Sequence, residues 1–179
     1  MVRITPYGVI MVTVDPARTA LVLVDLMQRI VDLPLAPRPG TAVLEAGCRL
    51  AERFRAAGAL VVALRSERPT AEQPPGSHLA ERAAALADAV VVKRTVGGFH
   101  QTGLHWTLQQ REVTTLVLAG IATNMGVEST ARSADDHGYE LLFAEDAMTA
   151  LTADEHRAAT TLSLPRFGRV VASAEIEPA

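Results

Sequence analysis

The sequence has little of several features that mark whole classes of protein. Its single cysteine, Cys48, excludes an internal disulfide and any thiolate metal cluster, and fits a reducing compartment. No apolar run is long enough to span a bilayer, and the N-terminal Met-Val-Arg-Ile-Thr-Pro has no secretory signal pattern. A net charge of −3 without a Lys/Arg cluster argues against nucleic acid or anionic membrane as partner. We therefore expect a cytoplasmic protein whose partner is a small molecule.

Metal-ligand patterns are also missing. The five His residues show no His-Glu-x-x-His or comparable spacing, so we expect surface or capping roles for them. The rest of the composition is ordinary, because 179 residues with 49% hydrophobic and 21% charged side chains can build one domain with a sizeable core. The sequence predicts a single domain over residues 1–179, without metal or cofactor.

Six short apolar runs are typical of strands buried on both faces of a parallel sheet. They cover residues 19–24, 60–64, 89–92, 116–119, 139–144 and 169–172. Helical patterns lie between most of them, at 39–57, 79–87, 104–113 and 127–138, and a capping box opens the last helix at 152–155. Strands alternating with helices predict a three-layer α/β/α fold, with a mainly parallel sheet of about six strands and helices on both faces. An earlier β-rich run, 8–14, should form an edge strand or an arm.

The fourth of these runs leads into a tight turn and a helix. Gly120 should end the strand where the backbone turns sharply. Thr123 and Asn124 then offer side-chain oxygens that can cap the helix. Met125 and Gly126 would lie in its first turn, at the carboxyl end of a buried strand, where free N–H groups favour a developing negative charge. We expect a ligand to bind at this turn.

The same stretch carries an extended motif. It contains Gly-Ile-Ala-Thr-Asn-Met-Gly-Val-Glu-Ser-Thr-Ala-Arg-Ser-Ala, followed by Asp-His-Gly-Tyr and by Glu145-Asp-Ala147. This motif resembles the signature of the isochorismatase-like hydrolases, which include nicotinamidases, carbamoylsarcosine amidohydrolases and isochorismatase. Most members have Gly-x-x-Thr-Asn-x-Cys-Val and then Thr-Ala, and the Cys attacks an amide carbonyl. This chain has Gly126 at the Cys position, so the resemblance, which extends from about Thr19 to Val171, implies the three-layer α/β scaffold without its usual nucleophile.

Asp25 and Lys93 each follow an apolar run, at the edge where open parallel sheets collect ligands. Taken alone, such an Asp is usually a turn or cap residue, and such a Lys beside Arg94 is a solvated cation. The resemblance implies sharper roles. Asp25, in Val-Asp-Leu-Met-Gln, matches the family's general base, and Lys93, in Val-Val-Val-Lys-Arg, matches its catalytic lysine. Phe99, in Gly-Gly-Phe, matches an aromatic residue that lines the site.

The resemblance also implies how substrate is held. A non-proline cis peptide is expected between Ile121 and Ala122, which would aim backbone N–H groups into the site. The predicted substrate-binding residues are Phe99, Ile121, Ala122, Thr123, Asn124 and Met125. Nicotinamidases have an Asp-x-His metal site after the second strand, where this chain has Arg-Ser-Glu-Arg at 65–68, so we expect no metal.

The missing thiol decides the expected chemistry. Thr123, Ser129 and Cys48 are unconvincing replacements, since the first fits a helix cap, the second points inward and the third lies on the first helix. Isochorismatase itself also has Gly at the nucleophile position, and hydrolyses a vinyl ether through an Asp that donates a proton, with no covalent intermediate. We therefore expect a hydrolase that uses Asp25 and Lys93 on a small carboxylated substrate, with isochorismate as the first compound to test.

Two other interpretations stay open: a catalytically inactive small-molecule-binding member of the superfamily, and an amidase-type hydrolase with an unrecognised nucleophile. A cationic side chain should bind the carboxylate of the substrate. The candidates are Arg65, Arg68, Arg94 and His100. The resemblance, and apolar surface beyond the needs of one small core, also predict a homo-oligomer, either a dimer or a tetramer.

Overall fold

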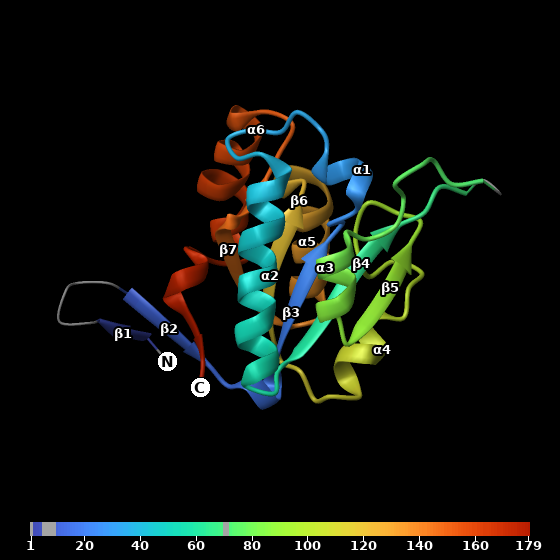
Figure 1. Ribbon diagram of the computed structural model, residues 1–179. Helices are drawn as coiled ribbons and strands as arrows, with labels where there is room; N and C mark the ends of the chain where they lie inside the picture. Colours follow the sequence, from blue (N-terminus) through green and yellow to red (C-terminus); the bar gives the residue numbers. More distant parts are fainter. Residues whose placement is uncertain (1, 5–9, 70–71) are drawn as a thin grey trace.

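The computed structural model describes residues 2–4, 10–69 and 72–179 (Figure 1). Its main sheet has the strand order β5-β4-β3-β6-β7-β8, and every neighbouring pair is parallel. The strands are β3 (Thr19–Val24), β4 (Leu60–Ser66), β5 (Ala89–Lys93), β6 (Thr115–Ile121), β7 (Glu140–Thr149) and β8 (Gly168–Val171). The predicted mainly parallel sheet of about six strands is confirmed.

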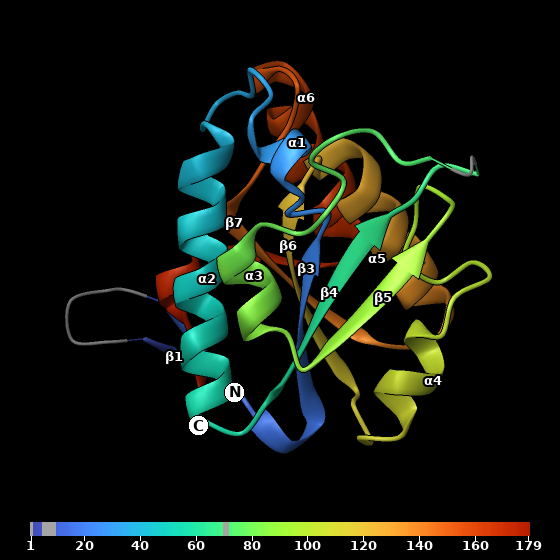
Figure 2. The ribbon, with the colours of Figure 1, turned by 45° about the vertical axis from the view of Figure 1, so that its right-hand side comes forward.

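Helices cover both faces of this sheet, with α2 and α3 on one side and α4 and α5 on the other (Figure 2). The helices are α1 (Gln28–Val31), α2 (Gly40–Ala56), α3 (Glu81–Leu86), α4 (Leu104–Gln109), α5 (Glu128–Asp136) and α6 (Ala153–Ala158). Shorter helical turns are η1 (Pro16–Arg18), η2 (Thr123–Val127), η3 (Ala159–Ser163), η4 (Leu164–Arg166) and η5 (Ser173–Glu175). The three-layer α/β/α prediction is therefore confirmed. Within the described ranges, no helix has the length and apolar character needed to cross a membrane.

Strand β3 shows how alternating side chains build a core on each face. Leu21 and Leu23 pack into the same cluster as Phe54 of α2, whereas Val22 and Val24 belong to the cluster that contains α4 and α5 side chains. All six β3 residues are buried, which explains why the sequence shows a continuous apolar run. Each fully buried Leu or Val contributes roughly 1.5–3 kcal/mol, so β3 is a rigid base for the residues that follow it.

A second, small sheet lies apart from the main one (Figure 1). Its central strand β2 (Ile10–Val14) pairs antiparallel with β1 (Val2–Ile4) and parallel with β9 (Ile176–Pro178). The run predicted at 8–14 thus forms an arm, although its first two residues lie outside the described residues. Strand β9 was not predicted, because three residues are too few to show a periodic pattern.

Two predicted boundaries near the turn after β6 were wrong. Gly120 does not end the strand, since β6 continues to Ile121. Gly120 instead has a φ of +122°, and a Cβ there would collide with the Val24 carbonyl group, so glycine lets β6 pass close to β3. Strand β7 continues past the predicted Ala144 to Thr149, because its pairing with β6 resumes after an irregularity beyond Leu118.

Candidate active site

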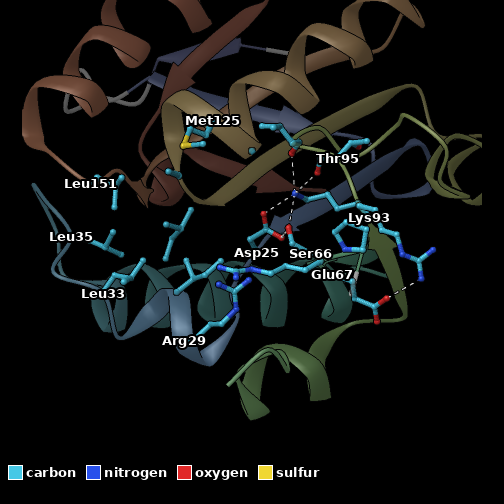
Figure 3. A pocket seen from close by; sticks show the side chains of 18 residues that line it. Asp25, Arg29, Leu33, Leu35, Ser66, Glu67, Lys93, Thr95, Met125 and Leu151 are labelled. Atoms are coloured by element: carbon cyan, nitrogen blue, oxygen red, sulfur yellow. Dashed lines mark hydrogen bonds and ion pairs between the residues drawn. The ribbon is translucent and has the colours of Figure 1, made fainter. Parts of the chain in front are cut away.

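The ends of β3 and β5 bring Asp25 and Lys93 together, as the sequence predicted. Lys93 Nζ lies 2.8 Å from Asp25 Oδ2, and the two side chains are only 2% and 8% exposed (Figure 3). The parallel register places both at the carboxyl edge of the sheet, although 68 positions of sequence numbering separate them. A buried ion pair of this kind needs further hydrogen bonds to offset the loss of hydration.

Ser66, which the sequence analysis did not single out, supplies some of those hydrogen bonds. It ends β4, the strand between β3 and β5. Its hydroxyl donates to Asp25 Oδ1 at 2.8 Å and accepts from Lys93 Nζ at 2.8 Å. The rule that selected Asp25 and Lys93 could have found it, because Ser66 is also a polar residue at the carboxyl end of a buried strand.

Lys93 is surrounded by oxygen atoms. Besides Asp25 and Ser66, its ammonium group donates to the carbonyl oxygens of Val96 at 2.9 Å and Thr95 at 3.3 Å. Four acceptors therefore face a group that has three N–H bonds. Each N–H bond of the Lys93 ammonium group therefore has an acceptor within the protein.

Asp25 has an unusual backbone conformation. Its φ is +50°, in the left-handed region that few residues other than glycine adopt, although Asp tolerates it better than most. Its N–H still donates to the Leu64 carbonyl oxygen at 3.1 Å, so the pairing with β4 continues one residue past β3. Residues held in such conformations cluster at functional sites, which agrees with the role predicted for Asp25.

Gly126 lies beside the carboxylate group of Asp25. A Cβ built at this position would lie 3.3 Å from Asp25 Oδ2, 3.0 Å from Val24 Cγ1 and 3.7 Å from the Ile121 carbonyl oxygen. The position where the resemblance places a nucleophilic thiol is therefore next to the acid, and in this chain it carries no side chain. Both carboxylate oxygens of Asp25 have partners, because Oδ1 accepts a hydrogen bond from Ser66 and Oδ2 pairs with Lys93.

A cavity of about 500 Å³ opens over these residues, a volume that suits a small organic molecule (Figure 3). Its polar lining includes Asp25, Ser66 and Lys93. Its apolar lining consists of Ile30, Leu33, Leu35, Pro69, Val96, Ile121, Ala122, Met125 and Leu151, and Gly126 also lines it. The cavity therefore has a charged region and an apolar wall.

Four of the predicted site residues on the turn after β6 line this cavity, and the peptide bond between Ile121 and Ala122 is cis, as the resemblance implied. The four are Ile121, Ala122, Met125 and Gly126. The adjacent segment is the turn η2, a π-helix that leads directly into α5. Asn124 is partly buried on the same turn but is not among the lining residues.

Thr123 does not line the cavity and does not cap the helix, so both predictions for it were wrong. Its side chain is fully buried, and its hydroxyl donates to the Thr149 carbonyl oxygen at 2.9 Å. The Thr123 hydroxyl oxygen also lies 2.8 Å from His156 Nδ1. The helical turn begins after Ala122, without a side-chain cap, because the Thr123 hydroxyl is engaged with β7 and α6 instead.

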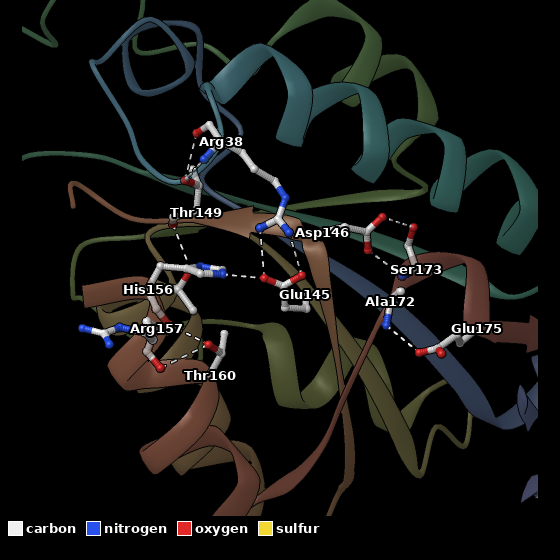
Figure 4. A network of polar contacts seen from close by, with 11 residues as sticks. Arg38, Glu145, Asp146, Thr149, His156, Arg157, Thr160, Ala172, Ser173 and Glu175 are labelled. Atoms are coloured by element: carbon white, nitrogen blue, oxygen red, sulfur yellow. Dashed lines mark hydrogen bonds and ion pairs between the residues drawn. The ribbon is translucent and has the colours of Figure 1, made fainter. Parts of the chain in front are cut away.

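His156 connects this turn to a partly buried charge network (Figure 4). His156 Nε2 lies 2.7 Å from Glu145 Oε1, and Arg38 donates to both oxygens of Glu145 at 3.0 and 2.8 Å. The hydrogen bond with His156, with a further contribution from Arg38, lowers the pKa of Glu145 to about 2 despite its partial burial. Glu145 is therefore a stable carboxylate at neutral pH.

Phe99 lies away from the cavity, so its predicted role in lining the site was wrong. Its ring is 8% exposed and packs at 5.1 Å from the His137 ring and 5.9 Å from the Tyr139 ring. Those partners lie after α5 and at the start of β7, so the ring fills the core on that face. The glycines before it face inward, because a Cβ at Gly98 would meet Leu64, Leu104 and Thr130.

The structure places only some of the predicted carboxylate-binding residues at the cavity. Arg68 and Arg94 line the cavity, whereas Arg65 does not, and His100 lines a separate hollow with Phe99. Arg29 also lines the cavity and was missed, because it lies in α1, a helix of four residues that is too short to show a sequence pattern. Within the described part of the chain, no group of three or more His, Cys, Asp or Glu side chains is arranged to hold a metal ion.

Known proteins resemble this chain over most of its length. The matching family model is the Isochorismatase domain, which covers residues 19–175. The uncharacterised isochorismatase family protein YecD of Escherichia coli O157:H7 is 36% identical over 186 residues, which span 93% of this chain and 98% of that protein. A shorter match is to the ureidoacrylate amidohydrolase RutB of Methylobacterium radiotolerans. It is 41% identical over 93 residues, which span 51% of this chain and 36% of that protein.

A solved structure gives the same result for the fold. An isochorismatase family protein from Burkholderia thailandensis superposes with a TM-score of 0.83 and 33% identity, covering 93% of this chain and 96% of that one. Sequence and fold comparisons therefore agree on one relationship. The chain belongs to the isochorismatase family of hydrolases.

Proposed function

We propose that this chain hydrolyses a small carboxylated substrate without forming a covalent enzyme intermediate. Asp25 acts as the general acid and base, and Lys93 supplies the positive charge that orients and polarises the substrate. The observation that carries the proposal is the glycine at position 126, which lines the cavity beside Asp25 Oδ2 and carries no side chain that could act as a nucleophile. An isochorismate-type vinyl ether is the first candidate substrate.

The absence of a side chain at Gly126 favours an attack by water. No atom of a glycine side chain can form a bond to the substrate, so this turn offers no nucleophile. A substrate atom or a water molecule can instead approach Asp25 Oδ2, within reach of a proton transfer. The free N–H groups at the start of a helical turn add a favourable field for negative charge at the same place.

A vinyl ether would react through a proton transfer from Asp25. In its protonated form, Asp25 adds its proton to the terminal vinyl carbon, and the carbon that bears the ether oxygen becomes cationic. Water adds to that carbon, and its proton passes to Asp25, which restores the acid. The hemiketal then collapses to an alcohol and a ketone. While Asp25 carries negative charge, the Lys93 ammonium group and the Ser66 hydroxyl stabilise it.

The test is an assay of the purified protein with isochorismate, beside nicotinamide and simple amides and esters. We expect turnover of the vinyl ether and no covalent adduct in the intact mass of rapidly quenched protein. Asp25→Asn should lower kcat by roughly 10²–10⁴-fold, the usual contribution of general acid–base catalysis. Full turnover by both Asp25→Asn and Lys93→Ala proteins would refute these roles. Tight retention of a ligand without turnover would favour the binding-protein interpretation.

A second candidate, an amidase-type hydrolase with a serine nucleophile, is favoured by the hydrogen bond from Ser66 to Asp25. A carboxylate in this arrangement can take the proton of an attacking alcohol. Ser66 Oγ would attack an amide carbonyl carbon, Asp25 would pass the proton to the leaving amine, and water would hydrolyse the resulting ester. Ser66→Ala would then abolish turnover, and a fluorophosphonate would label Ser66. Under the first proposal, Ser66→Ala only weakens turnover and no label forms.

A further inference from the structure

Three arginines line the cavity, and they differ in how their charge is compensated. Arg94 Nη2 lies 3.2 Å from Glu67 Oε2, so a carboxylate already pairs with it. Arg68 is exposed to solvent, which weakens any interaction it makes with a ligand. Arg29 is half-buried, and no carboxylate within the described ranges forms an ion pair with it. Arg29 therefore contributes a positive charge to the cavity that the chain itself does not neutralise.

The guanidinium group of Arg29 is held in place by a neutral partner. Its Nε donates to the Ser77 hydroxyl at 3.1 Å, and Ser77 is buried. The Arg29 backbone N–H donates to the Gly76 carbonyl oxygen at 3.0 Å, which fixes the loop before Ser77 against α1. A Cβ at Gly76 would lie 3.1 Å from the Arg29 Cβ, so glycine permits this close approach. The hydroxyl orients the group but leaves its charge uncompensated, and both terminal nitrogens stay free of partners among the described residues.

Arg29 also lies on the segment that carries Asp25. Helix α1 begins at Gln28, shortly after Asp25, and its Arg29 side chain points toward the part of the cavity where Asp25 and Ser66 lie (Figure 3). The next residues of this segment that line the cavity, Ile30, Leu33 and Leu35, are apolar. A ligand that fills both regions must therefore combine a negative group with an apolar body.

We propose that Arg29 binds the carboxylate group of the substrate, while the substrate's apolar body lies against the wall formed by Leu33, Leu35 and Leu151. A guanidinium group with two free terminal nitrogens matches the two oxygens of a carboxylate in a bidentate pair, which an ammonium group cannot reproduce. The inference rests on the proposed function for the reaction that follows, but carboxylate binding can be measured without any turnover.

The experiment measures binding of benzoate and of its neutral analogue benzamide to the full chain by isothermal titration calorimetry. We expect the native protein to prefer benzoate. Arg29→Gln should weaken benzoate binding at least tenfold and leave benzamide binding within twofold, and Arg29→Lys should fall between native protein and Arg29→Gln. The matched control is Arg94→Gln, which removes a cavity arginine already paired with Glu67 and should change benzoate binding less than twofold. Thermal melts establish that each variant is folded.

The outcomes separate this inference from the proposed function. Loss of benzoate binding in Arg94→Gln or Arg68→Gln but not in Arg29→Gln overturns the inference, as does a native protein that does not distinguish benzoate from benzamide. If Arg29→Gln binds benzoate normally while Asp25→Asn loses turnover, the reaction stands and the assigned anchor is wrong. If benzoate binding depends on Arg29 but no compound is hydrolysed, the anchor stands and the proposed hydrolysis is wrong.

Discussion

Two polar clusters contact the turn after β6, and they share the same kinds of groups. The front cluster, beside Gly126, consists of Asp25, Ser66 and Lys93. The rear cluster, which includes Thr123 of the same turn, consists of Thr123, Glu145, His156 and Arg38. Each contains a carboxylate, basic groups and a hydroxyl at hydrogen-bond distance. The front cluster lines the cavity, whereas none of the rear residues does, although the side chains of Glu145 and Arg38 are each 31% exposed.

The difference shows that an acid, a base and a hydroxyl group at hydrogen-bond distance from one another are not enough to form an active site. The rear cluster joins the turn to β7, to α6 and to the loop that precedes α2, because Arg38 and Thr149 also bond to each other through backbone and side-chain atoms (Figure 4). Both oxygens of Glu145 accept hydrogen bonds from Arg38, Thr123 and His156 are buried, and none of these groups lines the cavity. We infer that the front cluster reacts and that the rear cluster holds the turn in place, and this division can be tested.

The largest expected effect is on turnover, and it separates the two carboxylates. Asp25→Asn should reduce kcat by roughly 10²–10⁴-fold, whereas Glu145→Gln, once folded, should keep kcat within about tenfold, because Glu145 does not reach the cavity. Steady-state kinetics on the compound that the native protein hydrolyses best, at a temperature where both variants are folded, measure this difference. Equal losses of kcat in the two variants would contradict the division of roles.

The second effect is on stability and its dependence on pH. The pKa of Glu145 lies at about 2 in the folded protein, below its ordinary value of 4.5. The stabilisation of the folded state by this carboxylate is therefore fully present above pH 4.5 and is lost as the pH falls toward 2. This lowering of the pKa corresponds to a contribution of at most about 3 kcal/mol to the free energy of unfolding. Urea unfolding should show native protein more stable than Glu145→Gln at pH 7, and the gap should shrink as the pH falls from 4.5 toward 2. Glu177→Gln, at an exposed position, is the control and should change stability by less than about 0.5 kcal/mol.

The third effect concerns a thiol placed on each side of the turn. In Gly126→Cys, the new thiol would lie near Asp25 and a fixed ammonium group, and should react with iodoacetamide at least tenfold faster than Cys48, whose pKa is raised by burial. Thr123→Cys would place its thiol at a fully buried position of the rear cluster, where we expect no alkylation of native protein. Mass spectrometry of digested protein gives the rate at each site. Fast labelling of Thr123→Cys would show that the rear cluster is accessible.

The smallest effect uses Lys93, which is the sole lysine of the chain. Because its side chain is 2% exposed and its ammonium group is engaged by four oxygens, an amine-acylating reagent should modify the α-amino group of native protein and leave Lys93 intact. After unfolding in urea, both amines should react. Peptide mapping distinguishes the two, and rapid acylation of Lys93 in native protein would mean that the front cluster opens in solution.

Sequence alone predicted the part of the site that follows from strand ends. Asp25 and Lys93 could be paired because parallel strands present their carboxyl ends at one edge of the sheet. Ser66 meets the same condition but was missed, because the predicted run ended at Leu64, whereas β4 continues to Ser66. The roles of Asp25 and Lys93 in a reaction stay predictions, as does the homo-oligomer, which the mass of the native protein in solution will test.

Other predictions failed because short-range rules cannot include distant partners. Thr123 has the right type and position for a helix cap, but the Thr149 carbonyl group and His156 compete successfully for its hydroxyl. Phe99 follows two glycines, which could have formed a flexible loop that brings the ring to the site. Instead, side chains from three other elements pack closely against these glycines. Nothing in the local sequence indicates either competitor.

The sequence by itself determined the order of strands and helices, the family and the absence of a side chain at position 126, because each depends on residue identity and short-range periodicity. The tertiary structure decided which polar groups meet and which of them reach the cavity. Those properties depend on contacts between segments far apart in the chain, such as Arg29 with Ser77 and Thr123 with His156, and on the close approach of β6 to β3. Access to the cavity arises only when the layers are packed, so the same kinds of side chain line the cavity at Asp25 and lie away from it at Glu145.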